Sequence, residues 1–173
     1  MRTHLPWLSQ GDIFTAVPVV TVAVRASGGV EANFPTGPAV LLNHDCAMDK
    51  ASKAGKPNIK TLHFCRLIAV SVQDDARKRT LRESGITPYE VMYLGECGSF
   101  GESFITISEM YPLPTDYFAP NAIEWPNHDQ AASGDRYCTP SVNGDRIGRI
   151  DEDQVSMLRN KLNAFWTRLL PKE

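Results

Sequence analysis

The chain has 173 residues, of which 42% are hydrophobic and 22% charged, which is enough for one globular domain with its own core. Its net charge of −2 and pI near 6.1 argue against binding nucleic acid through bulk positive charge, so any such contact needs a local basic patch. No apolar run approaches the roughly 20 residues of a membrane span, and the N-terminus lacks an apolar signal core, so we expect a cytoplasmic protein that does not contact membranes.

The N-terminal third predicts strands separated by one loop. Residues 13–24 are dense in valine, threonine and phenylalanine, which indicates one long strand or two strands joined at Pro18. Residues 25–36 contain a Gly-Gly pair and are expected to be a loop. Residues 38–42 are a short apolar run typical of a buried strand. The run ends in four polar residues: Asn43, His44, Asp45 and Cys46. A rigid strand that delivers polar side chains into a loop is a common way to build a site.

The middle of the chain predicts two further strand regions around one helix. Residues 61–72 are expected to form a strand, and residues 74–83 a short exposed helix that ends at Gly85. Residues 89–94 and 104–107 are expected to form a hairpin around a glycine-bearing loop.

Two segments are expected to be insertions into a single domain that spans residues 1–173. Residues 46–60 are rich in lysine, and residues 111–135 are an irregular segment with four prolines. One more strand is expected within residues 136–150. Many short strands, long loops and one terminal helix predict a mainly β (α+β) fold, in the form of a small, partly open β-barrel.

The clearest predicted element is a C-terminal helix over residues 151–170. Asp151 is expected to cap it, with Gln154 reaching back, and Pro171 to end it. Its apolar residues recur every three or four positions, which predicts one buried face: Val155, Leu158, Leu162, Phe165, Trp166 and Leu169.

Three pieces of the sequence, in the same order, resemble the MazF/PemK toxin family, and together they cover about half of the chain. The first is the opening GDIF at residues 11–14, and the third is the segment from Arg149 to Leu170. The second is EAN at residues 31–33 followed by GPAV at 37–40 and NHD at 43–45. The resemblance implies an SH3-like barrel, a homodimer, an antitoxin-like protein partner, and cleavage of single-stranded RNA without metal or other cofactor.

The sequence departs from that family at two positions on which the family's chemistry depends. The family has an arginine directly before the proline of the second piece, and a threonine on the strand that residues 67–72 resemble. Gly37 and Ser71 occupy these positions here. Losing a group that stabilises charge on the cleaved phosphate typically costs ~100–1000-fold in rate.

Other residues supply candidates for the missing groups. His44 and His63 are expected to act as acid and base, since imidazole titrates near neutrality. Arg66 is expected to hold phosphate with its guanidinium, and Ser71 to contact a phosphate oxygen. The candidate catalytic residues are therefore His44, His63, Arg66 and Ser71. The candidate substrate-binding residues are Arg25, Asn43, Asp45, Tyr117 and Trp125, the last two as aromatic rings that stack on bases.

Two His-x-Cys pairs allow a different chemistry. On adjacent strands, the side chains of His44, Cys46, His63 and Cys65 would converge, and two histidines with two cysteines suit tetrahedral zinc. Cys46 is alternatively a nucleophile with His63 as its base. The competing interpretation is that Cys46 and Cys65 are core residues.

Three hypotheses therefore remain open from the sequence. The chain is an RNA-interacting endoribonuclease toxin or a relative of one, a non-catalytic module of the same fold that binds protein or nucleic acid, or a protein with a zinc- or thiol-dependent site. Gly37 favours the second hypothesis over the first.

Overall fold

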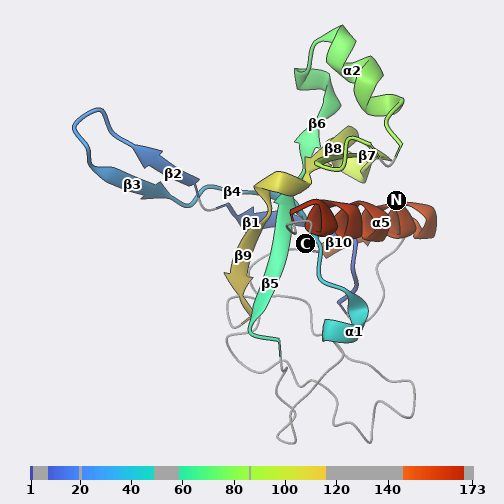
Figure 1. The fold of residues 1–173 in the computed structure, drawn as a ribbon, viewed down its shortest axis with the longest axis horizontal. Helices are drawn as coiled ribbons and strands as arrows, with labels where there is room; N and C mark the ends of the chain where they lie inside the picture. The colour runs from blue at the N-terminus through green and yellow to red at the C-terminus, as the bar shows by residue number, and fades with distance from the viewer. Residues whose placement is uncertain (2–7, 20, 49–58, 86, 116–145, 170–173) are drawn as a thin grey trace, which may run out of the picture.

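The computed structural model describes residues 1, 8–19, 21–48, 59–85, 87–115 and 146–169, and the account below is confined to them. The central element is a five-stranded antiparallel sheet in the order β10-β1-β4-β5-β9 (Figure 1). Its strands are β10 (Arg146–Arg149), β1 (Asp12–Pro18), β4 (Thr36–Leu41), β5 (Thr61–Arg66) and β9 (Tyr111–Pro114).

Two smaller antiparallel sheets and three α-helices complete the described part. The strands of the three-stranded sheet, in the order β6-β8-β7, are β6 (Ile68–Ala69), β8 (Glu102–Thr106) and β7 (Val91–Glu96). The two-stranded sheet is a hairpin of β2 (Thr21–Val24) and β3 (Val30–Asn33). The α-helices are α1 (Asp45–Met48), α2 (Asp75–Arg82) and α5 (Glu152–Leu169), and the 3-10 helices are η1 (Val70–Val72), η2 (Gly98–Phe100) and η3 (Ile107–Glu109).

The expectation of a mainly β, α+β fold with a C-terminal helix is confirmed. The sheets formed by the described residues are open, and none closes into a barrel. Within the same residues, no helix is both long enough and apolar enough to cross a membrane.

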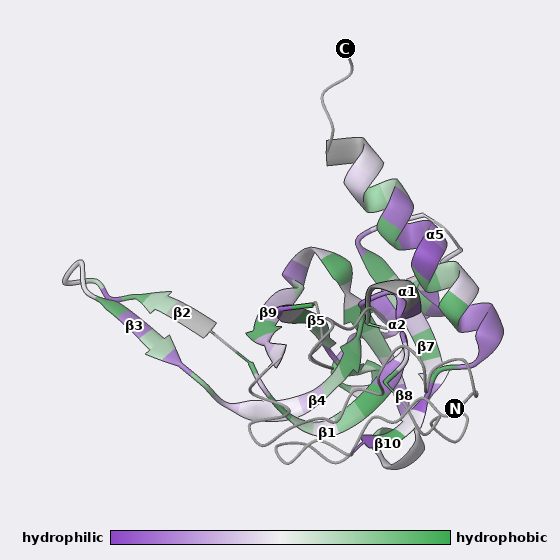
Figure 2. Cartoon of the chain, turned by 90° about the horizontal axis from the view of Figure 1, so that it is seen from below, coloured by the Kyte–Doolittle hydropathy of each residue, from purple (hydrophilic) through white to green (hydrophobic). Residues whose placement is uncertain are grey.

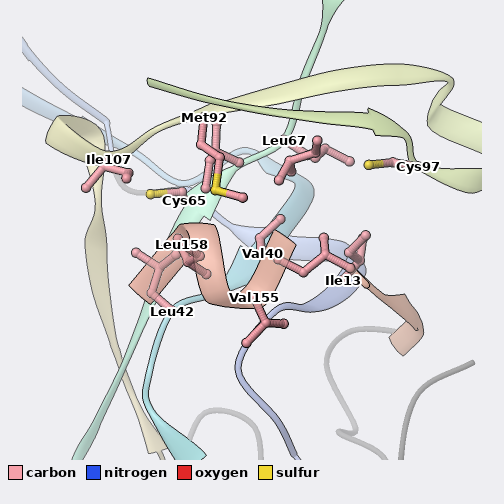
Figure 3. Close-up of a cluster of buried hydrophobic side chains, with 13 residues drawn as sticks. Ile13, Val40, Leu42, Cys65, Leu67, Met92, Cys97, Ile107, Val155 and Leu158 are labelled. Carbon is pink, nitrogen blue, oxygen red and sulfur yellow. The ribbon is translucent and has the colours of Figure 1, made fainter. Parts of the chain in front are cut away.

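The five-stranded sheet has apolar side chains on both faces, which alternate along each strand. On one face Phe64 of β5 meets Phe14 edge-on, at 5.8 Å between ring centroids, and stacks with Tyr111 at 6.3 Å. On the other face Val40 and Cys65 pack with α5 and the three-stranded sheet. Figure 3 shows this second cluster, in which Val155 and Leu158 of α5 lie beside residues of the sheet. The buried face of the predicted terminal helix is therefore confirmed for Val155 and Leu158.

The terminal helix starts as its sequence predicts. The Gln154 amide donates to Asp151 Oδ1 at 2.9 Å, and the Asp151 amide donates to Gln154 Oε1 at 3.0 Å, which is a reciprocal capping box. The prediction that Trp166 lies on the buried face is wrong, because this side chain is 54% exposed. Trp166 lies one residue after Phe165, whose ring is half-buried and contacts it edge-on.

Three segments differ from their predicted form. Residues 30–33, predicted as loop, form strand β3, which pairs with β2 around a turn at residues 25–29. Residues 61–72, predicted as one strand, divide at Leu67 into β5 and β6, and the chain passes there from one sheet to another before ending in η1. Residues 111–114, predicted as the start of an irregular insertion, form β9.

Gly11 of the GDIF segment has a structural explanation. Its φ angle is +88°, a left-handed conformation that favours glycine, and an added Cβ would lie 2.5 Å from Ile150 Cγ1. Its amide donates to the Leu41 carbonyl and its carbonyl accepts from the Ile150 amide, so this residue joins the ends of β4 and β10.

Candidate nucleic-acid interface

Arg66 is the last residue of β5, and its side chain is exposed. It lies opposite Ala39 of β4, and opposite residues of an antiparallel pair project from the same face of the sheet. Gly37, two residues before Ala39 on β4, lies on this face as well. Arg66 and Gly37 are therefore diagonal neighbours on one face, at the end of the strand pair.

The space above Gly37 is open. A Cβ atom added at this residue meets no atom within 4 Å, so a longer side chain fits there. Among the residues that the structure describes, Arg66 forms no ion pair, in contrast to the arginines at positions 25, 82, 146, 149 and 159. The guanidinium of Arg66 is thus available to an anion from solvent.

Tyr111 is a buried polar residue on which the charge of Arg66 acts. It lies opposite Phe64, two residues before Arg66, and its hydroxyl is buried without a hydrogen-bond partner in the described part of the chain. Burial raises the pKa of Tyr111, and the positive charge of Arg66 acts in the opposite direction. The hydroxyl therefore stays protonated at neutral pH, and it lies beneath the surface and not on it.

The two candidate histidines do not share this surface. His63 projects from the opposite face of β5, because it lies three residues from Arg66 along a regular strand, about 10 Å away. His44 is exposed and follows the far end of β4, where the Leu42 amide donates to the His63 carbonyl at 2.9 Å. The structure thus separates both histidines from Arg66 and Gly37.

Ser71, the fourth candidate catalytic residue, lies in η1 and not on a strand. Its side chain is exposed, and its neighbour Val70 is buried in the three-stranded sheet's own cluster with Leu81 and Phe104. The chain breaks at Leu67, so Arg66 and Ser71 lie on different elements.

The candidate binding residues Asn43 and Asp45 hold the backbone in place. Asn43 Oδ1 accepts from the His63 amide at 2.5 Å, and Asn43 Nδ2 donates to the Thr61 carbonyl at 3.4 Å. Asp45 accepts from the Gln10 amide at 2.7 Å and from Arg159 at 3.2 Å. These contacts occupy both side chains within the fold.

Arg25 lies on the β2–β3 hairpin, where its Nε and Nη2 donate to Glu31 Oε2 at 3.0 and 2.8 Å. This exposed pair spans the hairpin turn and occupies the guanidinium. Tyr117 and Trp125 lie outside the described residues.

Cys65 is a core residue. Its thiol is fully buried among apolar side chains, donates to the Thr106 carbonyl at 3.4 Å, and has its pKa raised to about 12 by burial. A thiol in this environment stays protonated and is a poor metal ligand or nucleophile. The described residues contain no group of three or more histidine, cysteine, aspartate or glutamate side chains placed to hold a metal ion. The side chain of Cys46 lies outside the described part.

Sequence reasoning missed a polar network around Gln10. Arg159 Nε donates to Gln10 Oε1 at 2.8 Å, and Arg149 Nε donates to the Gln10 carbonyl at 3.1 Å. Gln10 Nε2 in turn donates to the Leu42 carbonyl at 2.7 Å. This network ties the N-terminal turn to α5 and to the end of β4. The one sequence feature that could have indicated this network is Arg159, a charged residue that directly follows Leu158 on the buried face of the helix.

Comparison with known proteins gives no family for this chain. No protein-family model matches the sequence, and no curated protein matches it.

Proposed function

We propose that this chain is a cytoplasmic protein that binds single-stranded RNA through the Arg66 surface, defined as Arg66 and Gly37. The observation that carries the proposal is the exposed, unpaired guanidinium of Arg66 beside the open space above Gly37. An arginine offers a planar fork of donors that matches two oxygens of one phosphate.

The location of the surface also supports the proposal. The resemblance to the MazF/PemK family implies, at the position of Gly37, an arginine that stabilises charge on the cleaved phosphate, and Arg66 brings a guanidinium to the same sheet face from the neighbouring strand. The chain carries a net charge of −2, so we expect few phosphate contacts and weak binding. Because the salt dependence of the affinity grows with the number of phosphate contacts, we expect that dependence to be shallow.

The geometry favours binding without cleavage. A general acid or base must lie within hydrogen-bond reach of the proton it moves, directly or through one water. His63 lies on the other face of the sheet from Arg66, and His44 follows the far end of β4. The proposal is therefore a non-catalytic module, with the endoribonuclease as the alternative that the experiment below tests.

The test measures the fluorescence anisotropy of a labelled 20-nucleotide single-stranded RNA at 50–200 mM NaCl. Arg66→Ala should weaken binding by about tenfold or more, as expected for the loss of a charge-assisted hydrogen bond to phosphate. Lys60→Ala is the matched control, since Lys60 is an exposed cation about 20 Å away at the other end of β5. This control should change the affinity by less than about twofold.

A gain of affinity tests the same surface in the opposite direction. Gly37→Arg places a second guanidinium beside Arg66 and should tighten RNA binding. The slope of log affinity against log salt concentration should become steeper by the amount expected for about one added phosphate contact. Gly85→Arg is its control, because Gly85 also has open space around an added Cβ but follows α2. Absence of RNA binding, or equal effects of Arg66→Ala and Lys60→Ala, would contradict the proposal. Cleavage products that disappear in His63→Ala would favour the endoribonuclease.

A further inference from the structure

The end of β5 that carries Arg66 lies beside a carboxylate. Strands β5 and β9 are side by side in both views (Figures 1 and 2), and Phe64 of β5 is opposite Tyr111, the first residue of β9. Because the two strands are antiparallel, the chain that precedes Tyr111 runs alongside the residues that follow Phe64. Met110 has extended backbone angles, so Glu109 reaches the level of Arg66.

Glu109 is the last residue of the 3-10 helix η3, which contacts β5. Its side chain is exposed, as is that of Arg66. Burial and, after it, the negative charge of Glu109 raise the pKa of Cys65, the residue directly before Arg66. The charge of Glu109 therefore acts on this end of β5.

The side chains of Arg66 and Glu109 are neighbours that are not paired. In the part of the chain that the structure describes, neither of them takes part in an ion pair. Adjacent strands lie about 5 Å apart, and both side chains are long and exposed, so a change of rotamer can bring the carboxylate to the guanidinium. An exposed pair of this kind is weak, so a phosphate group can displace the carboxylate.

We propose that Glu109 is an autoinhibitory residue of the Arg66 surface, which competes with phosphate for the guanidinium of Arg66 and lowers the affinity of this surface for RNA. The inference rests on the proposed RNA binding and adds a residue that regulates it. In the free protein Glu109 neutralises Arg66, and in the complex it repels the phosphate that Arg66 holds. Both effects are lost when the carboxylate is replaced by an amide of the same shape.

The experiment measures the affinity of the full chain for the labelled 20-nucleotide RNA by fluorescence anisotropy at 50 mM NaCl. Glu109→Gln should tighten binding by about two- to fivefold, which is the size expected for the loss of an exposed charge interaction. Asp153→Asn is the matched control and should change the affinity by less than about 1.5-fold. It removes the same charge from an exposed residue of α5, and α5 follows β10, at the opposite edge of the five-stranded sheet from β9.

Further variants separate the charge of Glu109 from any structural role. Glu109→Asp keeps the charge and should bind RNA as the wild type does. In an Arg66→Ala background, Glu109→Gln should gain no more affinity than Asp153→Asn, because the guanidinium for which Glu109 competes is absent. The gain from Glu109→Gln should also shrink between 50 and 200 mM NaCl, since salt screens exposed charges. Far-ultraviolet circular dichroism checks that each variant is folded.

The outcomes distinguish this inference from the proposed function. RNA binding that depends on Arg66, but responds equally to Glu109→Gln and Asp153→Asn, would overturn the autoinhibition and leave the proposed function standing. A loss of affinity in Glu109→Gln would overturn it as well, because the carboxylate would then contribute to RNA binding. If neither the wild type nor Glu109→Gln binds RNA, the proposed function and the autoinhibition both fall.

Discussion

Asp12 and Arg146 form a buried ion pair, with 2.8 Å between Asp12 Oδ2 and Arg146 Nη1 and side-chain exposures of 0% and 5%. The same carboxylate oxygen accepts from the Ser9 amide at 2.8 Å. Burial raises the pKa of Asp12, and the charge of Arg146 opposes that shift. The pair joins the start of β1 to β10, across 134 residues of sequence.

Asp12→Ala should lower the free energy of unfolding by about 3–5 kcal/mol, because it leaves the buried guanidinium of Arg146 without its carboxylate. Urea unfolding followed by circular dichroism measures the change. Asp75→Ala is the control: Asp75 pairs with Lys78 but is 96% exposed, so its loss should cost less than about 1 kcal/mol. Equal losses in the two variants would show that Asp12 carries no special role in the fold.

Gly11→Ala should destabilise the protein for two reasons that separate variants can distinguish. The left-handed φ of +88° costs an L-residue roughly 1–2 kcal/mol, and the added Cβ overlaps Ile150. Gly28→Ala has the first cost alone, because Gly28 has a φ of +82° but open space around it. Gly37→Ala has neither.

The free energy of unfolding should therefore fall most in Gly11→Ala, less in Gly28→Ala, and not at all in Gly37→Ala. Urea titrations of the three variants give this order directly. If Gly11→Ala lowers the free energy of unfolding no more than Gly28→Ala does, the Ile150 side chain moves away from the added methyl group at position 11.

The elements that the sequence predicts well are those with a long or strongly marked pattern. The terminal helix has a capping residue and several turns of apolar periodicity, and helix α2 has Asp74, whose side chain accepts from the Arg77 amide at 2.8 Å. Both helices lie within one or two residues of their predicted bounds. The buried strand at residues 38–42 corresponds to β4.

The missed elements have physical reasons. Strand β9 contains Pro112 and Pro114, which argue against a central strand, but among the described strands it lies at the edge of the sheet and pairs with β5 alone. Strand β3 is four residues long and belongs to a two-stranded hairpin. None of its side chains is buried, so its sequence carries no alternation of buried and exposed positions that would predict a strand.

The candidate surface was predictable only in part. Arg66 was identified as a cation on the strand that leads to Ser71, whereas its place beside Gly37 follows from the pairing of β5 with β4, which the sequence did not predict. The network around Gln10 joins residues up to 149 positions apart, and local sequence patterns carry no information on such contacts.

Glu102 on β8 holds helix α2 to the three-stranded sheet. Arg82 of α2 donates to both its carboxylate oxygens, from Nε at 2.7 Å and from Nη2 at 2.5 Å, and the Tyr93 hydroxyl also donates to it. Hydrogen bonds from Arg82 and then Tyr93 lower the pKa of Glu102 from 4.5 to about 2. The contacts therefore stabilise the folded state above pH 4.5, and this contribution is lost as the pH falls towards 2.

Arg82→Ala should return the pKa of Glu102 most of the way towards 4.5, because it removes the largest cause of the shift, while Tyr93→Phe should give a smaller rise. Lys78→Ala is the matched control, since Lys78 acts on Glu102 only through its distant charge and should change the pKa least. An NMR titration of the Glu102 carboxyl carbon from pH 2 to 7 measures all three. In parallel, the stability difference between wild type and Arg82→Ala should shrink as the pH is lowered from 5 to 2. A Glu102 that titrates near 4.5 in the wild type would show that Arg82 and Tyr93 do not hold this carboxylate in solution.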